Sequence, residues 1–268
     1  MRLLAALFVA VVACQSAHGQ PTSQELITKF RKTIGADVTP GSIPYLIQYR
    51  GERYMYSLRD GRLTGEVFEF DSKLYGYTKK HNQHRKETET KIGVVPLKIV
   101  EVINGDKGWY QMNEGEAIAL SKAELAGRDQ RELHIEVFLG RESFDPGLWK
   151  FSPPKSTEVR GQDAWVFEAK RTNSQDPVTL YFAKQSGLLL RLTSQATDFA
   201  WLPGEKPKVE SFKRDLYFSD WKQFTGRMLP GHIQAFNDGV LWQQMEPVSV
   251  TLLKTIDDEM FAMPQPKK

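Results

Sequence analysis

Residues 45–77 read YLIQYRGERYMYSLRDGRLTGEVFEFDSKLYGY, and aromatic and β-branched residues recur along this stretch in short runs. The runs alternate with a period of two, which is typical of β-strands. They are separated by Arg50-Gly51-Glu52, Asp60-Gly61 and Asp71-Ser72-Lys73, whose Gly, Asp and Ser residues favour turns. The stretch therefore predicts a meander of short antiparallel strands.

Strand patterns continue on the carboxyl-terminal side of this meander. The polar segment 79–91 is predicted to be a solvated hairpin edge or loop, and 97–103 and 109–112 form a hairpin around a glycine-rich turn. Further strands are predicted at 164–169, 178–183, 188–194, 210–221, 232–236 and 248–253. Because strands follow one another with only two helical segments between them, the pattern favours one antiparallel sheet over βαβ units.

Two segments have helical rather than strand periodicity. Leu26, Ile27, Phe30 and Ile34 recur at one and two helical turns and predict an amphipathic helix over 23–34. Ser121 followed by Glu124 is a capping-box pattern, which predicts a second helix over 121–139 with an all-polar middle. The expected fold is thus α+β and mainly antiparallel β: a single curved half-barrel sheet with both helices packed on its concave face.

Composition sets the class of protein. The chain has 268 residues, of which 40% are apolar and 26% charged, so intrinsic disorder and collagen are excluded. Lys plus Arg number 36 and Asp plus Glu 33, a net charge of +3, which gives no electrostatic reason to expect nucleic acid as a partner.

The amino terminus has the pattern of a secretory leader. A short positive start, an apolar run over 3–13 and small residues before Gln20 predict a signal peptide over 1–19, followed by one domain over 20–268. Val11-Val12-Ala13-Cys14 also resembles a lipobox, so the alternative is cleavage before Cys14 and lipidation of that residue. Cys14 is the only cysteine, which excludes disulfides from the folded body, and no later apolar run is long enough to span a membrane.

Residues with catalytic or metal-binding chemistry are present, but their spacing does not form a known motif. His81 and His84 lie among Lys and Arg residues that would repel a cation, which favours a solvated loop over a metal site. The remaining candidates each have a structural interpretation: His134, His232, the pair Asp215 and Asp220, and Asp257-Asp258. The sequence therefore predicts a non-enzyme without a cofactor or metal.

A longer string of residues in the second half resembles a known family. It consists of Val159-x-Gly161-x-x-Ala164, 177–182 (PVTLYF), 186–191 (SGLLLR), Tyr217-x-Ser219-Asp220-Trp221 with Gly226 and Leu229-Pro230, and Ile256-Asp257-Asp258-x-x-Phe261-x-x-Pro264. In order and spacing the string is similar to the exported LolA-like family of outer-membrane lipoprotein-sorting proteins, which shares a superfamily with LolB and RseB. The divergent planctomycete-type members resemble it most. The resemblance implies an open antiparallel half-barrel whose helices cover an apolar cavity, and it maps no ligand-contacting arginine onto this chain.

Together these observations predict an exported cell-envelope protein that binds a lipid or the acyl chains of a lipoprotein in a cavity between sheet and helices. The alternative is a protein-interaction or sensor module with a collapsed cavity. In the first case the second helix is expected either to gate the cavity or to cover it statically. The residues expected to meet the ligand are Leu125, Leu133, Val137 and Phe138.

Overall fold

The computed structural model describes residues 20–36, 43–56, 63–77, 83–92, 94–122, 124–125, 147, 149–172, 177–200 and 208–265. Most of them belong to one antiparallel sheet with the strand order β6-β5-β4-β3-β2-β1-β16-β15-β12-β11-β10-β9-β7, in which β8 also pairs with β9. Its strands are β1 (Pro44–Tyr56), β2 (Leu63–Tyr77), β3 (Gln83–Ile92), β4 (Val95–Asn104), β5 (Lys107–Met112), β6 (Ile118–Ala119), β7 (Trp149–Phe151), β8 (Lys155–Val159), β9 (Gln162–Arg171), β10 (Val178–Ala183), β11 (Leu189–Ala200), β12 (Lys208–Ser219), β15 (His232–Asn237) and β16 (Val240–Leu252).

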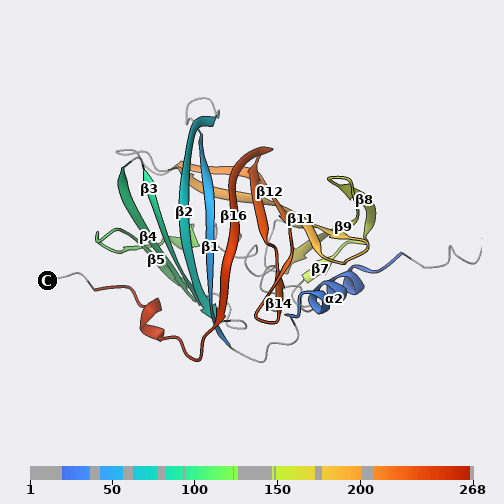
Figure 1. Cartoon of the computed structure of the whole chain (residues 1–268), viewed down its shortest axis with the longest axis horizontal. Helices are drawn as coiled ribbons and strands as arrows, with labels where there is room; N and C mark the ends of the chain where they lie inside the picture. The colour runs from blue at the N-terminus through green and yellow to red at the C-terminus, as the bar shows by residue number, and fades with distance from the viewer. Residues whose placement is uncertain are drawn as a thin grey trace, which may run out of the picture.

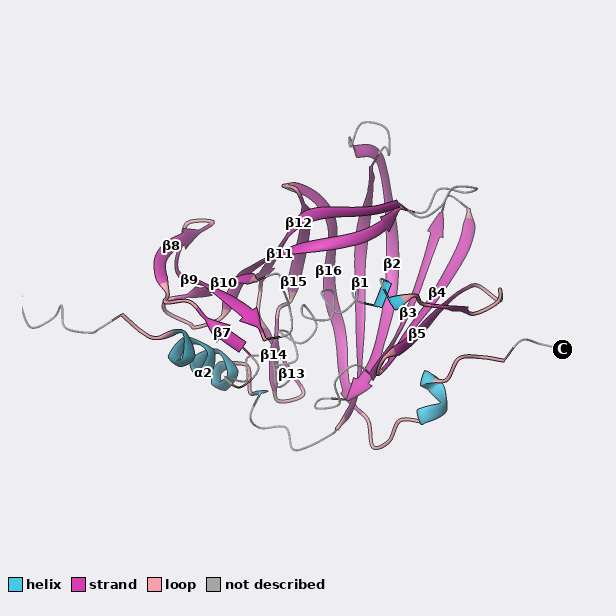
Figure 2. Cartoon of the chain, turned by 180° about the vertical axis from the view of Figure 1, so that it is seen from behind, coloured by secondary structure: helices cyan, strands magenta, loops and turns pink. Residues whose placement is uncertain are grey.

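The sheet is open and strongly curved. Strands β1 to β5 run steeply, whereas β11 and β12 cross the view, so the two halves enclose a concave side (Figures 1 and 2). Register shifts within the pairs β1–β16, β10–β11 and β15–β16 mark β-bulges, which bend strands and increase their twist. A small two-stranded sheet, β13 (Lys222–Phe224) with β14 (Arg227–Leu229), lies near its α2 end (Figure 2). The predicted mainly antiparallel half-barrel is confirmed.

Two of the three turns predicted within residues 45–77 are wrong. Arg50, Gly51 and Glu52 lie in the middle of β1, and Asp71, Ser72 and Lys73 lie in the middle of β2. The two strands pair without interruption there, with Arg50 opposite Asp71 and Gly51 opposite Phe70. Four predicted short strands are therefore two long ones, and the third predicted turn, Asp60-Gly61, lies outside the described residues.

The solvated hairpin edge or loop predicted over 79–91 is also wrong from residue 83 onward. Those residues form β3, which pairs with β2 on one side and β4 on the other. Its charged side chains are accommodated by partners, because Glu87 and Glu89 form ion pairs with Lys98. His84 is only 6% exposed, so it is not part of a solvated loop.

The first predicted helix is confirmed as α2 (Ser23–Thr33), and its amino terminus explains where it begins. Thr22 is the N-cap and forms a capping box with Glu25. Leu26, Ile27 and Phe30 are buried in the main core together with residues of β9 to β12. The helix therefore covers the concave side at that end of the sheet (Figure 1).

A second, smaller core lies on the opposite side of the sheet. It contains Val100 and Val102 of β4, Trp109 of β5, and Phe261 from a short 3-10 helix, η3 (Asp258–Phe261). Phe261 is 1% exposed, and its carbonyl oxygen accepts a hydrogen bond from Trp109 Nε1 at 3.4 Å. The carboxyl-terminal segment thus runs from β16 to the far side of β3 to β5 (Figure 2).

Candidate functional site

The face of the sheet that packs on α2, called here the inner face, changes character from one end to the other. Below α2 it is apolar and tightly packed, with Leu180, Phe182, Leu189 and Leu192 fully buried. The Phe30 and Phe182 rings meet edge to face with centroids 5.3 Å apart. This half is an ordinary hydrophobic core.

Toward β1 and β12 the same face carries two arginines. In β1 the residues in phase with buried Tyr45 and Ile47 are Tyr49, Gly51 and Arg53. In β12 Arg214 occupies the phase of buried Leu216 and Phe218, and it is itself only 3% exposed. Strand alternation therefore places both side chains on the inner face, where Arg214 is buried and Arg53 is half-buried.

Both arginines lie against the same indole ring. The Cζ atom of Arg53 is 5.0 Å from the Trp242 ring centroid, and that of Arg214 is 4.5 Å from it. Trp242 sits at the β-bulge between β15 and β16, and it packs against the main core, so the bulge turns its ring to the inner face. Cation–π contacts of this kind are worth about 0.5–2 kcal/mol each, depending on desolvation. We call Arg53, Trp242 and Arg214 the Arg–Trp–Arg cluster.

Amide side chains hold the two guanidinium groups in place. Arg53 Nη2 donates to Gln243 Oε1 at 3.3 Å, and Arg214 Nε donates to Asn237 Oδ1 at 3.1 Å. Gln243 is 5% exposed, so this is a desolvated contact.

Three arginines on the outer face have carboxylate partners. Arg191 donates from Nε and Nη2 to the carboxylate of Asp215, at 3.0 and 2.7 Å. Burial opposes the charge of Arg191, but this carboxylate outweighs it and raises the pKa of the guanidinium group. Arg85 pairs with Glu87 at 2.7 Å and Arg50 with Asp71 at 3.4 Å. A fourth outer-face arginine, Arg160, instead donates to the Gln234 amide oxygen at 2.8 Å and lies over the Tyr217 ring.

Other polar groups extend the inner site across β2 and β3. The hydroxyl groups of Ser72 and Thr88 lie 2.9 Å apart in a buried hydrogen bond. Burial raises the pKa of the Tyr49 phenol well above its ordinary value of about 10, and neighbouring Tyr45 adds to the shift. The inner face is therefore amphipathic, with an apolar half below α2 and a more polar half centred on β1 and β16.

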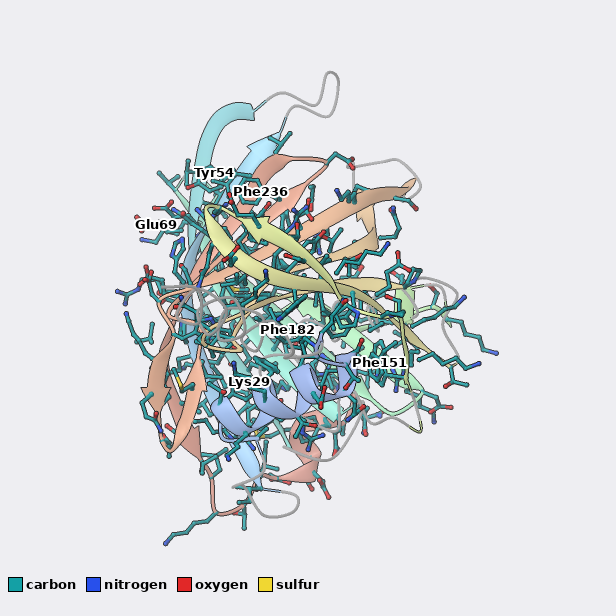
Figure 3. All side chains as sticks on the ribbon, turned by 90° about the vertical axis from the view of Figure 1, so that its right-hand side faces the viewer. Lys29, Tyr54, Glu69, Phe151, Phe182 and Phe236 are labelled. Atoms are coloured by element: carbon teal, nitrogen blue, oxygen red, sulfur yellow. The ribbon has the colours of Figure 1, made fainter. Side chains whose placement is uncertain are left out.

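The outer face carries a hollow of about 1810 Å³ over β15, β16 and β1 to β4. Mainly outer-face side chains line it, and many are charged, including Arg50, Glu69, Glu89 and Lys98. Figure 3 shows Glu69 at the edge of the molecule, away from α2 and Phe182. Glu52 and Glu69 are direct neighbours on paired strands, an arrangement that costs rather than adds stability.

The ligand-contacting residues expected from the sequence are largely outside the described residues. Ser121 does cap a helix start, because its hydroxyl accepts from Glu124 N and its own N–H donates to the Glu124 carboxylate. Leu125 is half-buried in that first turn. Leu133, Val137 and Phe138 lie outside the described residues, as do Cys14, His81 and His134, so their predicted roles stay predictions.

The remaining sequence candidates have structural surroundings. Asp215 is held by Arg191 and Thr193, whereas Asp220 is exposed in a turn after β12, so the two do not form a carboxylate pair. His232 lies 3.5 Å from Glu246 on the outer face. Asp257 caps η3 by accepting from Glu259 N. Among the described residues no group of three or more His, Cys, Asp or Glu side chains could hold a metal ion.

Sequence reasoning missed the Arg–Trp–Arg cluster, although a signal for it exists. Placing a turn at Arg50-Gly51-Glu52 breaks the strand phase, so Arg53 loses its relation to Tyr45 and Ile47. In β12 the signal is plainer, because Phe212-x-Arg214-x-Leu216-x-Phe218 puts an arginine among apolar residues of one phase. Trp242 could not have been assigned to a face, because its bulge depends on pairing with a distant strand.

Comparison with known proteins supports the fold. A DUF1329 family protein from Desulfovibrio piger matches over 88% of this chain and 97% of its own, with a TM-score of 0.52 and 12% identity. A LolA superfamily protein from Nitrosomonas europaea matches over 90% of this chain and 98% of its own, with a TM-score of 0.49 and 11% identity. A chain of the Pseudomonas aeruginosa MucA/MucB complex matches over 86% of this chain and 99% of its own, with a TM-score of 0.22 and 9% identity. No family model matches the chain, and no curated protein does.

The first of these similarities shows a shared fold. The observed sheet, open and curved with a helix on its concave side, is the architecture that the resemblance to the LolA-like family implied, and at the level of fold that expectation is confirmed. In the part of the chain that the structure describes, no helix is long and apolar enough to cross a membrane.

Proposed function

We propose that the protein is a non-catalytic component of the cell envelope whose inner face binds an amphipathic ligand, such as a lipid or the acyl chains of a lipoprotein. The observation that supports this most directly is the division of the inner face into an apolar half and a half with two arginines. A face that serves only as a core has no need of desolvated charges, which are costly to bury. A ligand with a long apolar part and a polar end matches both halves.

Native mass spectrometry of the purified protein tests the proposal by looking for co-purified lipid. Displacement of a fluorescent fatty-acid analogue gives the affinity, and Phe212→Ala is expected to weaken it about tenfold, because Phe212 lies beside Arg214 on the inner face. Phe236→Ala is the matched control, since Phe236 is equally half-buried but packs against Tyr217 on the outer face. No binding of any amphiphile by the folded wild type would refute the proposal.

The same function requires export. The expected mature form begins at Gln20, or at an acylated Cys14 if the lipobox is used. Mass spectrometry of the amino terminus from envelope fractions distinguishes these two products, and an intact Met1 contradicts both. The leader is proposed from the sequence alone. The single domain over 20–268 is proposed because the sheet is continuous.

A second candidate function is that of an envelope protein-interaction module, and the outer hollow is the observation that favours it. A partner would meet charged residues such as Glu52 and Glu69 there. A photo-crosslinking residue at position 69 should then give a specific adduct in cells, while one at Gln195, exposed elsewhere, should not. Adducts at both positions, or at neither, argue against this function.

A further inference from the structure

We infer that the hollow on the outer face docks a polypeptide segment that carries lysine or arginine side chains beside apolar ones. The inference rests on the second candidate function, binding of an envelope protein partner, and adds to it the chemistry of that partner. It concerns the outer face alone, so it does not depend on ligand binding by the inner face. Glu69 marks the hollow in Figure 3, away from α2 and Phe182.

The size of the hollow favours a polypeptide over a small molecule. Its volume is about 1810 Å³, and its lining comes from the neighbouring strands β15, β16 and β1 to β4. Sites for small ligands are usually clefts of about 300–1,000 Å³ that enclose most of the ligand. A segment of extended chain therefore matches the hollow better than a single small ligand does.

The charges of the lining do not balance. Five carboxylates and three Lys or Arg side chains line the hollow: Glu52, Glu69, Asp71, Glu89 and Glu246 against Arg50, Lys91 and Lys98. Two of the cations are already paired, because Arg50 lies 3.4 Å from Asp71 and Lys98 lies 3.4 Å from Glu89. The hollow therefore carries an excess of negative charge, and a basic partner would complement it.

The unpaired part of this charge lies at Glu52 and Glu69, which are direct neighbours on β1 and β2. Neither forms an ion pair with any residue that the structure describes. The Glu52 carboxylate accepts hydrogen bonds from Tyr54 Oη at 2.8 Å and from Gln244 Nε2 at 2.7 Å, and both donors are uncharged. Two carboxylates thus face the hollow side by side without a cation between them.

This pair differs from the other opposed carboxylates of the hollow. Asp71 and Glu89 are also direct neighbours, on β2 and β3, but each of them has a cation of its own. Like charges placed directly opposite each other on paired strands are destabilising. Departures of this kind from the rules of stability are expected at functional sites. A bound lysine or arginine would remove the repulsion between Glu52 and Glu69.

Exposed apolar side chains lie beside these carboxylates. Val67, on the same strand and face as Glu69, is 48% exposed, and Val248 is 54% exposed. Val248 is the extra residue of a β-bulge, because Gln48 pairs with Ser249 and the next residue, Tyr49, pairs with Pro247. Protein interfaces combine an apolar centre with a polar rim. The hollow therefore fits a partner segment in which basic and apolar side chains lie close together.

Binding of labelled twelve-residue peptides, followed by fluorescence anisotropy, tests the inference. The peptides are four repeats of Lys-Val-Gly, Gln-Val-Gly, Glu-Val-Gly or Lys-Ser-Gly. Wild type is expected to bind the Lys-Val-Gly peptide at least tenfold more tightly than the Glu-Val-Gly peptide, and added salt should narrow the difference. The Lys-Ser-Gly peptide should bind more weakly because it lacks valine. Since the whole chain has a net charge of +3, non-specific attraction would favour the Glu-Val-Gly peptide instead.

Variants locate the site. Glu69→Lys should weaken binding of the Lys-Val-Gly peptide at least tenfold and leave the Gln-Val-Gly peptide unaffected, and Glu69→Gln should weaken it about threefold. Lys91→Gln should strengthen it about twofold, because Lys91 is an exposed cation of the lining. Glu168→Lys is the matched control, since Glu168 is an exposed carboxylate on β9 outside the hollow.

A measurement of stability separates binding from a structural role. Glu69→Gln should not lower the midpoint of thermal unfolding, because the substitution removes repulsion from Glu52. A weaker peptide complex with unchanged or higher stability supports a binding role for Glu69. A loss of binding that only accompanies a lower unfolding midpoint argues against that role.

The outcomes separate this inference from the functions on which it builds. Equal affinity for the Lys-Val-Gly and Glu-Val-Gly peptides, or no binding of the former by folded wild type, overturns the basic partner. A specific crosslink from position 69 in cells would then still support a protein partner of other chemistry. A lysine preference that survives in Glu69→Lys, or is lost equally in Glu168→Lys, overturns the location.

Discussion

At the scale of single residues, Gly51 shows why a turn-forming residue can be required inside a strand. A Cβ atom built at this position would lie 2.3 Å from the Gln244 carbonyl oxygen, 2.7 Å from the Phe70 ring and 2.9 Å from Met245. Two of these neighbours are a backbone atom and a packed ring, which cannot easily move. Gly51 is therefore needed for close approach of β1, β2 and β16, not for a reversal of the chain.

Gly51→Ala is expected to lower the free energy of unfolding by about 1–3 kcal/mol, the usual range for overpacking. Chemical denaturation measures the change, with Arg50→Ala as the control at the adjacent exposed position. The control should stay within about 0.5 kcal/mol of wild type, since exposed ion pairs contribute little. Equal effects of the two substitutions would mean that the close approach of the strands is not the reason why position 51 requires glycine.

Tyr49 gives a prediction about alkaline pH. Its pKa is raised in the folded protein, so above pH 10 the unfolded state loses this proton first and the folded state becomes relatively less stable. The resulting loss is about 1.4 kcal/mol per pH unit above the ordinary tyrosine pKa. Tyr49→Phe should lose less stability between pH 10 and 11 than wild type does, as followed by urea unfolding. A parallel decline of both proteins would contradict the assignment.

At the scale of elements, the strands and α2 were predictable because each rests on local periodicity. Phe30 recurs at helical spacing with Leu26 and Ile27, and Thr22 with Glu25 supplies the cap. The lengths of β1 and β2 were not predictable, since Asp71 and Ser72 are placed in a strand by cross-strand partners far along the chain. The Arg–Trp–Arg cluster escaped prediction for the same reason, because strand phase and bulge position depend on pairing.

The two cores give an element-scale prediction. Phe261→Ala removes a buried ring from the outer face of β4 and β5, whereas Phe30→Ala removes one from between α2 and Phe182. Each should cost about 3–5 kcal/mol. Hydrogen exchange should accelerate first in β3 to β5 for Phe261→Ala, and first in α2 and β10 for Phe30→Ala.

Exposed neighbours serve as controls for these two substitutions. Met263→Ala and Thr28→Ala should leave exchange almost unchanged, because Met263 is 41% exposed and Thr28 is exposed on α2. If Phe261→Ala accelerated exchange in α2 as early as in β4, the two cores would not be locally distinct.

At the scale of the whole molecule, the continuity of the sheet depends on one pairing between distant parts of the chain. β1 is the first strand and β16 the last, yet they pair along nine residue positions. The half formed by β2 to β6 is joined to the half formed by β7 to β15 through this pair. Such a long-range closure brings the start and the end of the sheet together in the middle of the fold.

Because both halves share that central pair, we expect residues 20–268 to unfold as one unit. Ile47 is fully buried in β1 opposite Val250, at the junction. Ile47→Ala should cost about 2–5 kcal/mol and lower the midpoint of a single calorimetric transition. Leu46→Ala, at the neighbouring half-buried outward position, should lower the midpoint less. Two resolved transitions in wild type, of which Ile47→Ala shifts only one, would show instead that the halves are separate domains joined at β1 and β16.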